Sequence, residues 1–222
     1  MGVWTNVNAN DGHELAAYQA SANGAVAPGI VLLQEIFGVT PELRALADRF
    51  HEYGYGAVVP ALYDRIQPDC VIVIDDADLA RATKNQLRYD EIECDIRAAI
   101  KLADNGRGVA LLGYCWGGGL AYWIAQKCRV EAVISYYGKS LAQYCKPPPP
   151  SALCQFHLGV DDPMIDSDAR QVIRRSCRSI DEYFEYAGAG HAFANVERSS
   201  YRQAQAELAE KRCLSFLNQV FS

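Results

Sequence analysis

The segment from Val109 to Gly119 constrains the fold of this chain more than any other part of the sequence. Its first four residues, Val109 to Leu112, are all apolar and predict a buried strand. The strand leads into a G-x-C-x-G pattern centred on Cys115, with Gly113 and Gly117 two positions to either side. Glycines at this spacing permit a strained turn between closely packed elements, so we predict a strand, a sharp turn and a helix in that order.

Strand-like and helix-like segments alternate along most of the sequence. Short apolar runs predict strands at Gly29–Leu33, Ala57–Pro60, Val109–Leu112, Ala132–Ile134, Ala152–Leu158 and Glu182–Tyr186. Helical spacing predicts helices from Pro41 to about Gly54, over much of Asp78–Leu102, and at Trp116–Lys127, Asp168–Cys177 and Tyr201–Phe221. Thr40 is a suitable N-cap for the first of these helices. The order predicts an α/β fold with a mainly parallel central sheet flanked by helices, in one domain over residues 1–222.

Composition narrows the possible functions. The chain has 222 residues, of which 50% are hydrophobic and 22% charged, which is typical of a globular protein. A formal charge of -6 with scattered basic residues argues against a nucleic-acid partner. Because the sequence has no basic leader and no apolar run of about 20 residues, we expect a cytoplasmic protein that does not span a membrane. We expect the eight widely spaced cysteines to be reduced thiols and to form no metal site.

Three residue types that support nucleophilic catalysis follow one another along the chain. Cys115 comes first, the adjacent carboxylates Asp161 and Asp162 follow a predicted strand, and His191 lies in a glycine-rich loop after the next strand. In α/β-hydrolases the nucleophile, the acid and the base occur in this order at the ends of strands. This order favours a catalytic role for His191. We interpret the remaining histidines as structural: His13, His51 and His157.

Several segments together resemble the dienelactone hydrolase family. These segments are Gln34–Gly38, Gly113–Gly118, Tyr136–Gly138, Phe156–Gly159 and Gly190–Ala194. The resemblance covers most of the chain. It implies a monomeric α/β-hydrolase that needs no cofactor and acts on small-molecule esters or lactones, such as the dienelactones formed when aromatic rings are broken down.

The resemblance also implies roles for individual residues. Cys115 matches the nucleophile, His191 the base and Asp162 the carboxylate that orients the base, with Asp161 as the competing choice. Glu35 matches a carboxylate that holds or accepts the proton of the cysteine until substrate binds.

Further residues match the groups that bind substrate in the family. The backbone N–H groups of Ile36 and Trp116 would form the oxyanion hole. Phe37 and Arg81 match substrate-binding positions. At Asn195 the chain departs from the family, where an arginine typically helps to bind the substrate carboxylate. The departure leaves the reaction type in place but puts the identity of the substrate in doubt.

Two alternatives remain open. The same three residues could serve a broader carboxylesterase, a thioesterase or a promiscuous hydrolase of activated esters. A non-catalytic relative could instead use Cys115 as a redox-sensing thiol. A sensor needs a reactive cysteine but has no use for Asp162 or an oxyanion hole, so the sequence favours a hydrolase.

Overall fold

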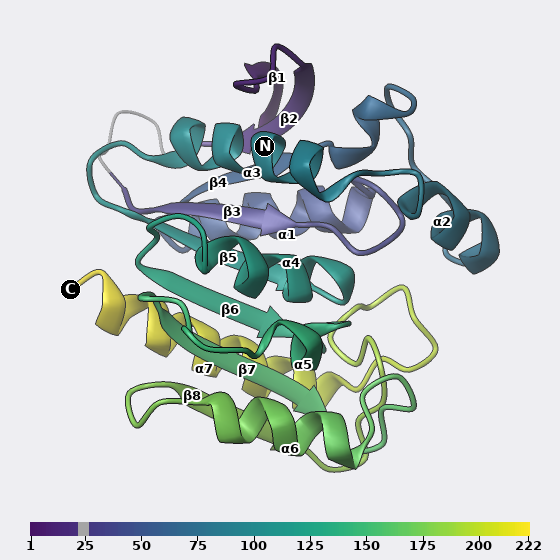
Figure 1. Cartoon of the computed structure of the whole chain (residues 1–222), viewed down its shortest axis with the longest axis vertical. Coiled ribbons are helices and arrows are strands. Elements are labelled where there is room, and N and C mark those ends of the chain that lie inside the picture. Colours follow the sequence, from purple (N-terminus) through teal and green to yellow (C-terminus); the bar gives the residue numbers. More distant parts are fainter. Residues whose placement is uncertain (22–26) are drawn as a thin grey trace. The chain divides into compact units, whose positions relative to one another are not determined.

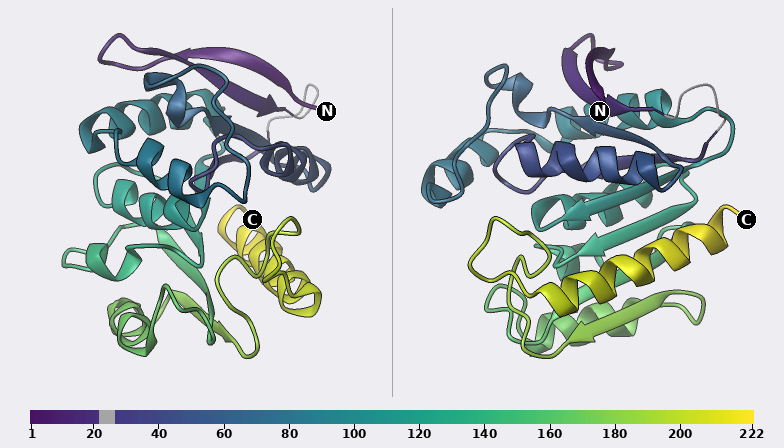
Figure 2. Two further views of the ribbon diagram at one scale, coloured as in Figure 1. Left: turned by 90° about the vertical axis from the view of Figure 1, so that its right-hand side faces the viewer. Right: turned by 180° about the vertical axis from the view of Figure 1, so that it is seen from behind.

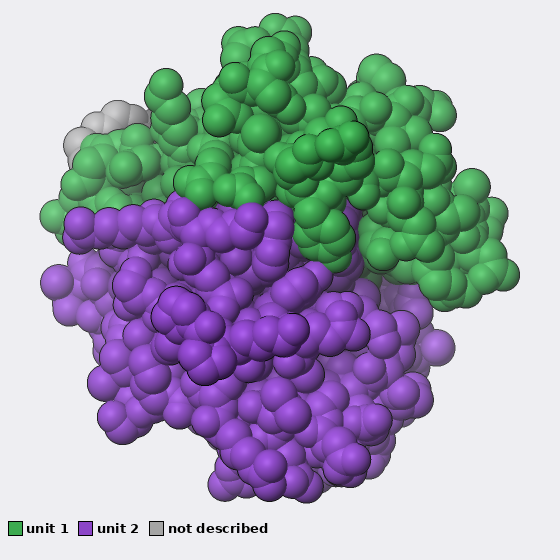
Figure 3. Space-filling model, in the orientation of Figure 1, with its two compact units in different colours: residues 1–109 green, residues 110–222 purple. Residues whose placement is uncertain are grey.

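The computed structural model describes residues 1–21 and 27–222. Its helices and strands are labelled in Figure 1, and Figure 2 shows them from two other sides. The chain divides into two compact units, unit 1 at Met1–Val109 and unit 2 at Ala110–Ser222 (Figure 3). The mainly parallel strands with flanking helices confirm the predicted α/β class. That residues 1–222 form one domain stays a prediction.

Unit 1 contains four strands in the order β1-β2-β4-β3. The strands are β1 (Val3–Asn8), β2 (Glu14–Ala20), β3 (Gly29–Leu33) and β4 (Gly56–Pro60). The helices are α1 (Pro41–Glu52), the short 3₁₀ helix η1 (Leu62–Arg65), α2 (Ala77–Lys84) and α3 (Tyr89–Ala103). β3 and β4 pair in parallel, whereas β2 pairs antiparallel with both β1 and β4. Helices α1 and α3 cover opposite faces of this sheet (Figures 1 and 2).

Local sequence signals explain where α1 begins and ends. Thr40 accepts a hydrogen bond from the backbone N–H of Leu43, and Pro41 occupies the first helical position, where no intrahelical N–H bond is needed. The chain leaves the helix through Gly54, whose φ of 92° lies in the left-handed region that glycine tolerates best. The predicted N-cap of this helix is therefore correct.

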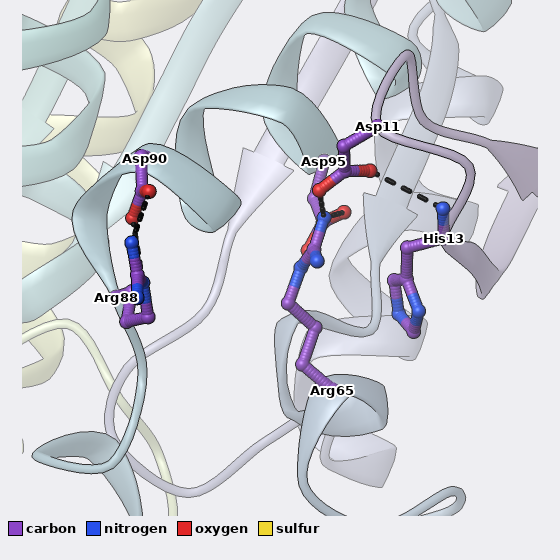
Figure 4. Close-up of polar contacts among 6 residues, drawn as sticks. All are labelled: Asp11, His13, Arg65, Arg88, Asp90 and Asp95. Atoms are coloured by element: carbon purple, nitrogen blue, oxygen red, sulfur yellow. Dashed lines mark hydrogen bonds and ion pairs between the residues drawn. The ribbon is translucent and has the colours of Figure 1, made fainter.

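An ion pair ties the first hairpin of unit 1 to its helices. Arg65, at the end of η1, donates to both carboxylate oxygens of Asp95 on α3, each at 2.7 Å, and to Asp11 in the β1–β2 turn at 2.7 Å (Figure 4). The Asp95 side chain is fully buried. Because the guanidinium links residues far apart in sequence, this anchor could not be found from local patterns.

Unit 2 contains a four-stranded parallel sheet. Its strands are β5 (Val109–Tyr114), β6 (Ala132–Tyr136), β7 (Leu153–Gly159) and β8 (Glu182–Tyr186), and they pair in chain order. Its helices are α4 (Trp116–Ala125), α5 (Leu141–Tyr144), α6 (Ser167–Ser176) and α7 (Gln203–Val220). Helix α7 covers the face of the sheet opposite to α4 and α6 (Figures 1 and 2). Because all four strands run in parallel, their carboxyl ends meet at one edge.

Candidate active site

The predicted sharp turn lies between β5 and α4, with Cys115 at its centre. Cys115 has φ 51° and ψ -116°, a conformation that non-glycine residues rarely adopt. Its N–H donates to the carbonyl of Tyr136 at 3.0 Å, and its own carbonyl accepts from the N–H groups of Gly118 at 3.1 Å and Lys139 at 2.8 Å. These backbone bonds hold the cysteine in a strained geometry, as is common for residues at functional sites.

Close packing around the turn explains the glycines of this segment. A Cβ added to Gly113 would lie 2.0 Å from the carbonyl oxygen of Gly117. A Cβ on Gly119 would lie 2.2 Å from the carbonyl oxygen of Lys139. Both approaches are far too short for any side chain, so the start of α4 fits here only because these positions are glycine.

Cys115, His191 and Asp162 form a hydrogen-bonded line within unit 2. Nε2 of His191 lies 3.1 Å from Sγ of Cys115, and Nδ1 lies 2.7 Å from Oδ2 of Asp162. The other oxygen of Asp162 accepts the backbone N–H of Met164 at 2.8 Å. The Asp162 side chain is fully buried and that of His191 is 11% exposed. The arrangement has the geometry of a nucleophile, a base and a carboxylate that fixes the base.

The two adjacent carboxylates differ sharply in position. Asp161 is exposed to solvent, and its backbone N–H donates to the carbonyl of Ala189 at 3.0 Å. Asp162, the next residue, points its carboxylate at the His191 ring. The geometry therefore pairs His191 with Asp162 rather than with the competing choice.

The loop that carries His191 is fixed by contacts from neighbouring segments. The Ser200 hydroxyl donates to the backbone carbonyl of His191 at 2.5 Å. The ring of Tyr137, directly after β6, meets the imidazole edge to face with 5.2 Å between centroids. Tyr137 was part of a motif of the resemblance but received no role from the sequence. Its contact depends on the pairing of distant strands, which local patterns do not report.

Electrostatics favour a protonated imidazole next to the thiol. Burial of the ring lowers the pKa of His191, but hydrogen bonds to Asp162 and Cys115 and the charges of these groups outweigh it and raise the pKa to about 10. Sγ also stands at the N-terminus of α4, whose dipole favours negative charge. The site is thus suited to a thiolate–imidazolium pair.

Four aromatic rings lie on paired positions of neighbouring strands in the sheet of unit 2, near the strand ends that hold the candidate active site. Tyr114, Tyr136, His157 and Phe184 pair across β5 to β8. Successive ring centroids are 4.8, 4.3 and 5.7 Å apart, all stacked. Cys115 directly follows Tyr114 in the chain, so this ladder packs the sheet immediately before Cys115.

His157 is held inside this ladder by two hydrogen bonds. Its Nδ1 lies 2.8 Å from the Tyr186 hydroxyl, and its Nε2 lies 2.8 Å from Oε1 of Gln155. Burial lowers the pKa of His157 to about 3. A ring with these neutral partners and no access to solvent is suited to packing rather than proton transfer.

Four residues assigned by resemblance lie in unit 1. Glu35, Ile36 and Phe37 follow β3 after Gln34. The carbonyl of Ile36 accepts from the Tyr63 hydroxyl at 2.7 Å. The carbonyl of Phe37 accepts the N–H of Ile72 at 3.0 Å, and the Phe37 side chain is buried. Arg81, on α2, forms a surface ion pair with Asp78. Their roles in catalysis and binding stay predictions.

Two further assigned residues lie in unit 2. Trp116 is the first residue of α4, so its backbone N–H directly follows Cys115. Asn195 follows the His191 loop, and its side-chain oxygen accepts the backbone N–H of Glu197 at 2.9 Å. The amide of Asn195 thus stabilises a local turn, and its role toward substrate stays a prediction.

Three findings concern disulfides, metals and membranes. All eight cysteines are free thiols. Within residues 1–21 and 27–222, no group of three or more His, Cys, Asp or Glu side chains could hold a metal ion. Over the same ranges, no helix combines the length and the apolar character needed to cross a bilayer.

The fold and this site define a class of hydrolases. The family model of the dienelactone hydrolase family matches residues 15–221, so the chain belongs to that family. Carboxymethylenebutenolidase from Pseudomonas putida is 34% identical over 223 residues, covering 96% of this chain and 94% of that enzyme. The protein is therefore a hydrolase of the dienelactone hydrolase type with an α/β-hydrolase fold.

Solved structures support the same fold. A crystal structure from Klebsiella pneumoniae subsp. pneumoniae that carries the dienelactone hydrolase name superposes with a TM-score of 0.83, at 22% identity and 99% coverage of both chains. A dienelactone hydrolase-like promiscuous phosphotriesterase from metagenomic libraries gives a TM-score of 0.80 at 16% identity, covering 100% of this chain and 99% of that one. At these identities the likeness concerns the fold alone.

Proposed function

We propose that this protein hydrolyses small carboxylic esters or lactones, with Cys115 as nucleophile, His191 as base and Asp162 as the carboxylate that orients the base. The observation that carries the proposal is the line of two hydrogen bonds through His191, 3.1 Å to Sγ and 2.7 Å to Oδ2. A thiol sensor would gain nothing from a buried carboxylate behind the histidine, so the line favours a hydrolase over a redox-sensing relative.

The first half of the reaction forms an acyl-enzyme. With its proton on Nε2 of His191, Cys115 attacks the carbonyl carbon as a thiolate, and the π electrons of the carbonyl move to its oxygen. The N–H of Trp116, the residue after Cys115, would stabilise this oxyanion, with the N–H of Ile36 assigned as its partner by the resemblance. When the carbonyl re-forms, the C–O bond to the alcohol breaks, and the alkoxide or enolate takes the proton from His191.

The second half regenerates the enzyme. Neutral His191 removes a proton from water, which attacks the thioester carbon. The C–S bond then breaks, releasing the carboxylic acid and restoring the thiolate and the imidazolium. Throughout, Asp162 holds the Nδ1–H of the ring and thereby keeps Nε2 directed at the reacting groups.

The substrate is proposed at the level of a class. A relative named carboxymethylenebutenolidase supports a lactone. Asn195 supports an uncharged ester or lactone instead of a carboxylate-bearing one, because its oxygen is engaged by Glu197 and its amide carries no charge. Thioesters and activated esters suit the same three residues, so they form the alternative.

The test is a substrate panel with a dienelactone, a p-nitrophenyl ester and an acyl thioester, measured before and after treatment with iodoacetamide. Cys115→Ala should lose at least about a thousandfold in kcat/KM on every substrate that the protein hydrolyses. Cys128→Ala is the matched control, because this thiol donates to the helix carbonyl of Ile124 at 3.3 Å, at the opposite end of α4 from Cys115. Full activity in Cys115→Ala, with unaltered circular dichroism, would overturn the proposal.

A further inference from the structure

A cavity of about 220 Å³ lies within unit 1, at the carboxyl ends of β3 and β4. Gln34 directly follows β3 and Ala61 directly follows β4; both line the cavity, as does Arg44 from α1. The segment around Cys70 and Val71 also contributes to the wall. In open α/β sheets, ligands bind outside the carboxyl ends of the strands, so the cavity lies at the edge where such sites form.

Gln34 contributes to this cavity a buried amide that is unpaired in the described part of the chain. Its side chain is 0% exposed, and within the described residues neither its amide nitrogen nor its amide oxygen has a hydrogen-bond partner. Buried polar side chains almost always have a partner, because an unpaired donor or acceptor destabilises the fold. A leucine or methionine would fill the same space without that penalty. The presence of an amide at this position therefore indicates a ligand that forms the missing hydrogen bonds.

Arg44 adds a positive charge to the same wall. Its Nε is buried and, among the residues that the structure describes, has no hydrogen-bond partner. The guanidinium instead lies 5.9 Å from the ring centroids of both Trp4 and Tyr18. These cation–π contacts hold the group in place and leave the Nε–H to donate to a ligand.

Two carboxylates also line the cavity and limit what it can hold. Asp64 accepts the backbone N–H of Ala16 at 2.8 Å, and burial raises its pKa, which favours the uncharged form. Asp69 lies further along the same segment. Because burial favours the uncharged form of Asp64, Arg44 faces one remaining carboxylate, Asp69, and a ligand with more than one negative charge would be repelled.

We propose that this cavity binds a small monocarboxylic acid that also carries a hydroxyl group. The carboxylate would accept hydrogen bonds from Nε of Arg44 and from the amide nitrogen of Gln34, and the hydroxyl would donate to the amide oxygen of Gln34. The apolar side chains of Val39, Val71 and Trp4 contact the carbon skeleton. At roughly 30 Å³ per water-sized group, 220 Å³ accommodates a molecule of about seven non-hydrogen atoms.

The binding test uses three probes of matched size: lactate, propionate and propane-1,2-diol. Titration calorimetry on the full chain should show lactate binding, with propionate and the diol each weaker by roughly tenfold or more, because each lacks one of the two polar groups. Gln34→Met should weaken lactate binding by at least roughly tenfold. Gln86→Met, an exposed change on unit 1, is the matched control and should bind as the wild type does.

One further variant separates this cavity from the proposed catalytic residues, and a melting measurement on Gln34→Met separates it from a purely structural amide. Cys115→Ser should bind lactate with unchanged affinity, since the nucleophile has no part in the cavity. Without ligand, Gln34→Met should melt at a higher temperature than the wild type, because it removes an unpaired buried amide. Lactate binding that survives Gln34→Met, or its absence from the wild type, would overturn the proposal, as would a lower melting temperature in Gln34→Met.

Discussion

The strand interior around His157 and the loop site around His191 place similar imidazole rings in opposite chemical states. Both rings are largely buried, and both have two hydrogen-bonding partners. The partners of His157 are the neutral groups of Tyr186 and Gln155, and burial lowers its pKa to about 3. Burial acts in the same direction on His191, yet its pKa is raised to about 10.

The difference shows that the charge of the partners, more than burial, decides what a buried histidine can do. Asp162 and Cys115 can each carry a negative charge, and a negative charge close to the ring stabilises the imidazolium. A phenol and an amide offer hydrogen bonds without charge, so the ring of His157 stays neutral. The sheet thus contains one histidine suited to packing and one suited to proton transfer.

The largest expected effect comes from breaking the carboxylate contact of His191. Asp162→Asn replaces the charge with an amide and favours the wrong ring tautomer, so kcat should fall on the order of 10³- to 10⁴-fold. The matched control is Asp161→Asn, whose carboxylate is exposed, and it should change kcat by less than about threefold. Steady-state kinetics on one activated ester measure both. Equal losses in the two variants would remove Asp162 from the mechanism.

The next effect concerns the pH dependence of stability. The folded protein holds the pKa of His157 at about 3, below the ordinary value of 6.5, so only the unfolded chain takes up this proton as the pH falls from 6.5 toward 3. His157 thereby reduces stability by up to about 1.4 kcal/mol per pH unit across that range.

His157→Gln removes the titrating ring but keeps a donor and an acceptor for its two partners. Urea unfolding between pH 7 and pH 4 should show a smaller acid loss of stability in His157→Gln than in the wild type, even if the variant is less stable at pH 7. His51→Gln, a change on α1, controls for losing a histidine in the unfolded chain. If the free energy of unfolding falls equally steeply with pH in His157→Gln and in the wild type, His157 is not neutral in the folded protein.

The smallest expected effect is on substrate preference and concerns Asn195, in the loop after His191. Asn195→Arg restores the arginine typical of the family and offers a charged fork to a substrate carboxylate. We expect kcat/KM for a carboxylate-bearing dienelactone to rise by roughly 10- to 100-fold, the range for a hydrogen bond to a charged group, with a neutral ester almost unchanged. A wild type that already prefers the charged lactone, with no gain from the arginine, would assign carboxylate binding to another residue.

Strands and helices with strong local signals could be predicted from the sequence. The predicted bounds of β3 and β8 are correct because each run ends at turn-forming or polar residues. The region 78–102 is largely helical, as predicted, and it forms two helices, α2 and α3. No glycine or proline marks the break between them. Arg88 forms an ion pair with Asp90 where α3 begins (Figure 4). The β1–β2 hairpin was not predicted, since Arg65 anchors it through long-range contacts.

The residues of the candidate site also fall into two groups: those with local sequence signals and those whose position depends on long-range packing. Cys115 and His191 could be found because their glycine-rich surroundings and their order along the chain are local features. Asp162 and Asp161 are neighbours with the same chemistry, and only the path of the chain after β7 shows which one faces the ring. The contact of Tyr137 with His191 depends on how β6 and the histidine loop pack, so no sequence signal reports it.

The central claim, that Cys115 is the nucleophile, is tested most directly by trapping the acyl-enzyme. The protein is mixed with p-nitrophenyl acetate, quenched in acid within the first turnovers and digested, and the peptides are mapped by mass spectrometry. The account predicts an acetyl group on Cys115, and much slower acetylation in His191→Ala, where no base accepts the thiol proton. Turnover of the ester with Cys115 unmodified at every quench time, or with the acetyl group on another residue, would contradict it.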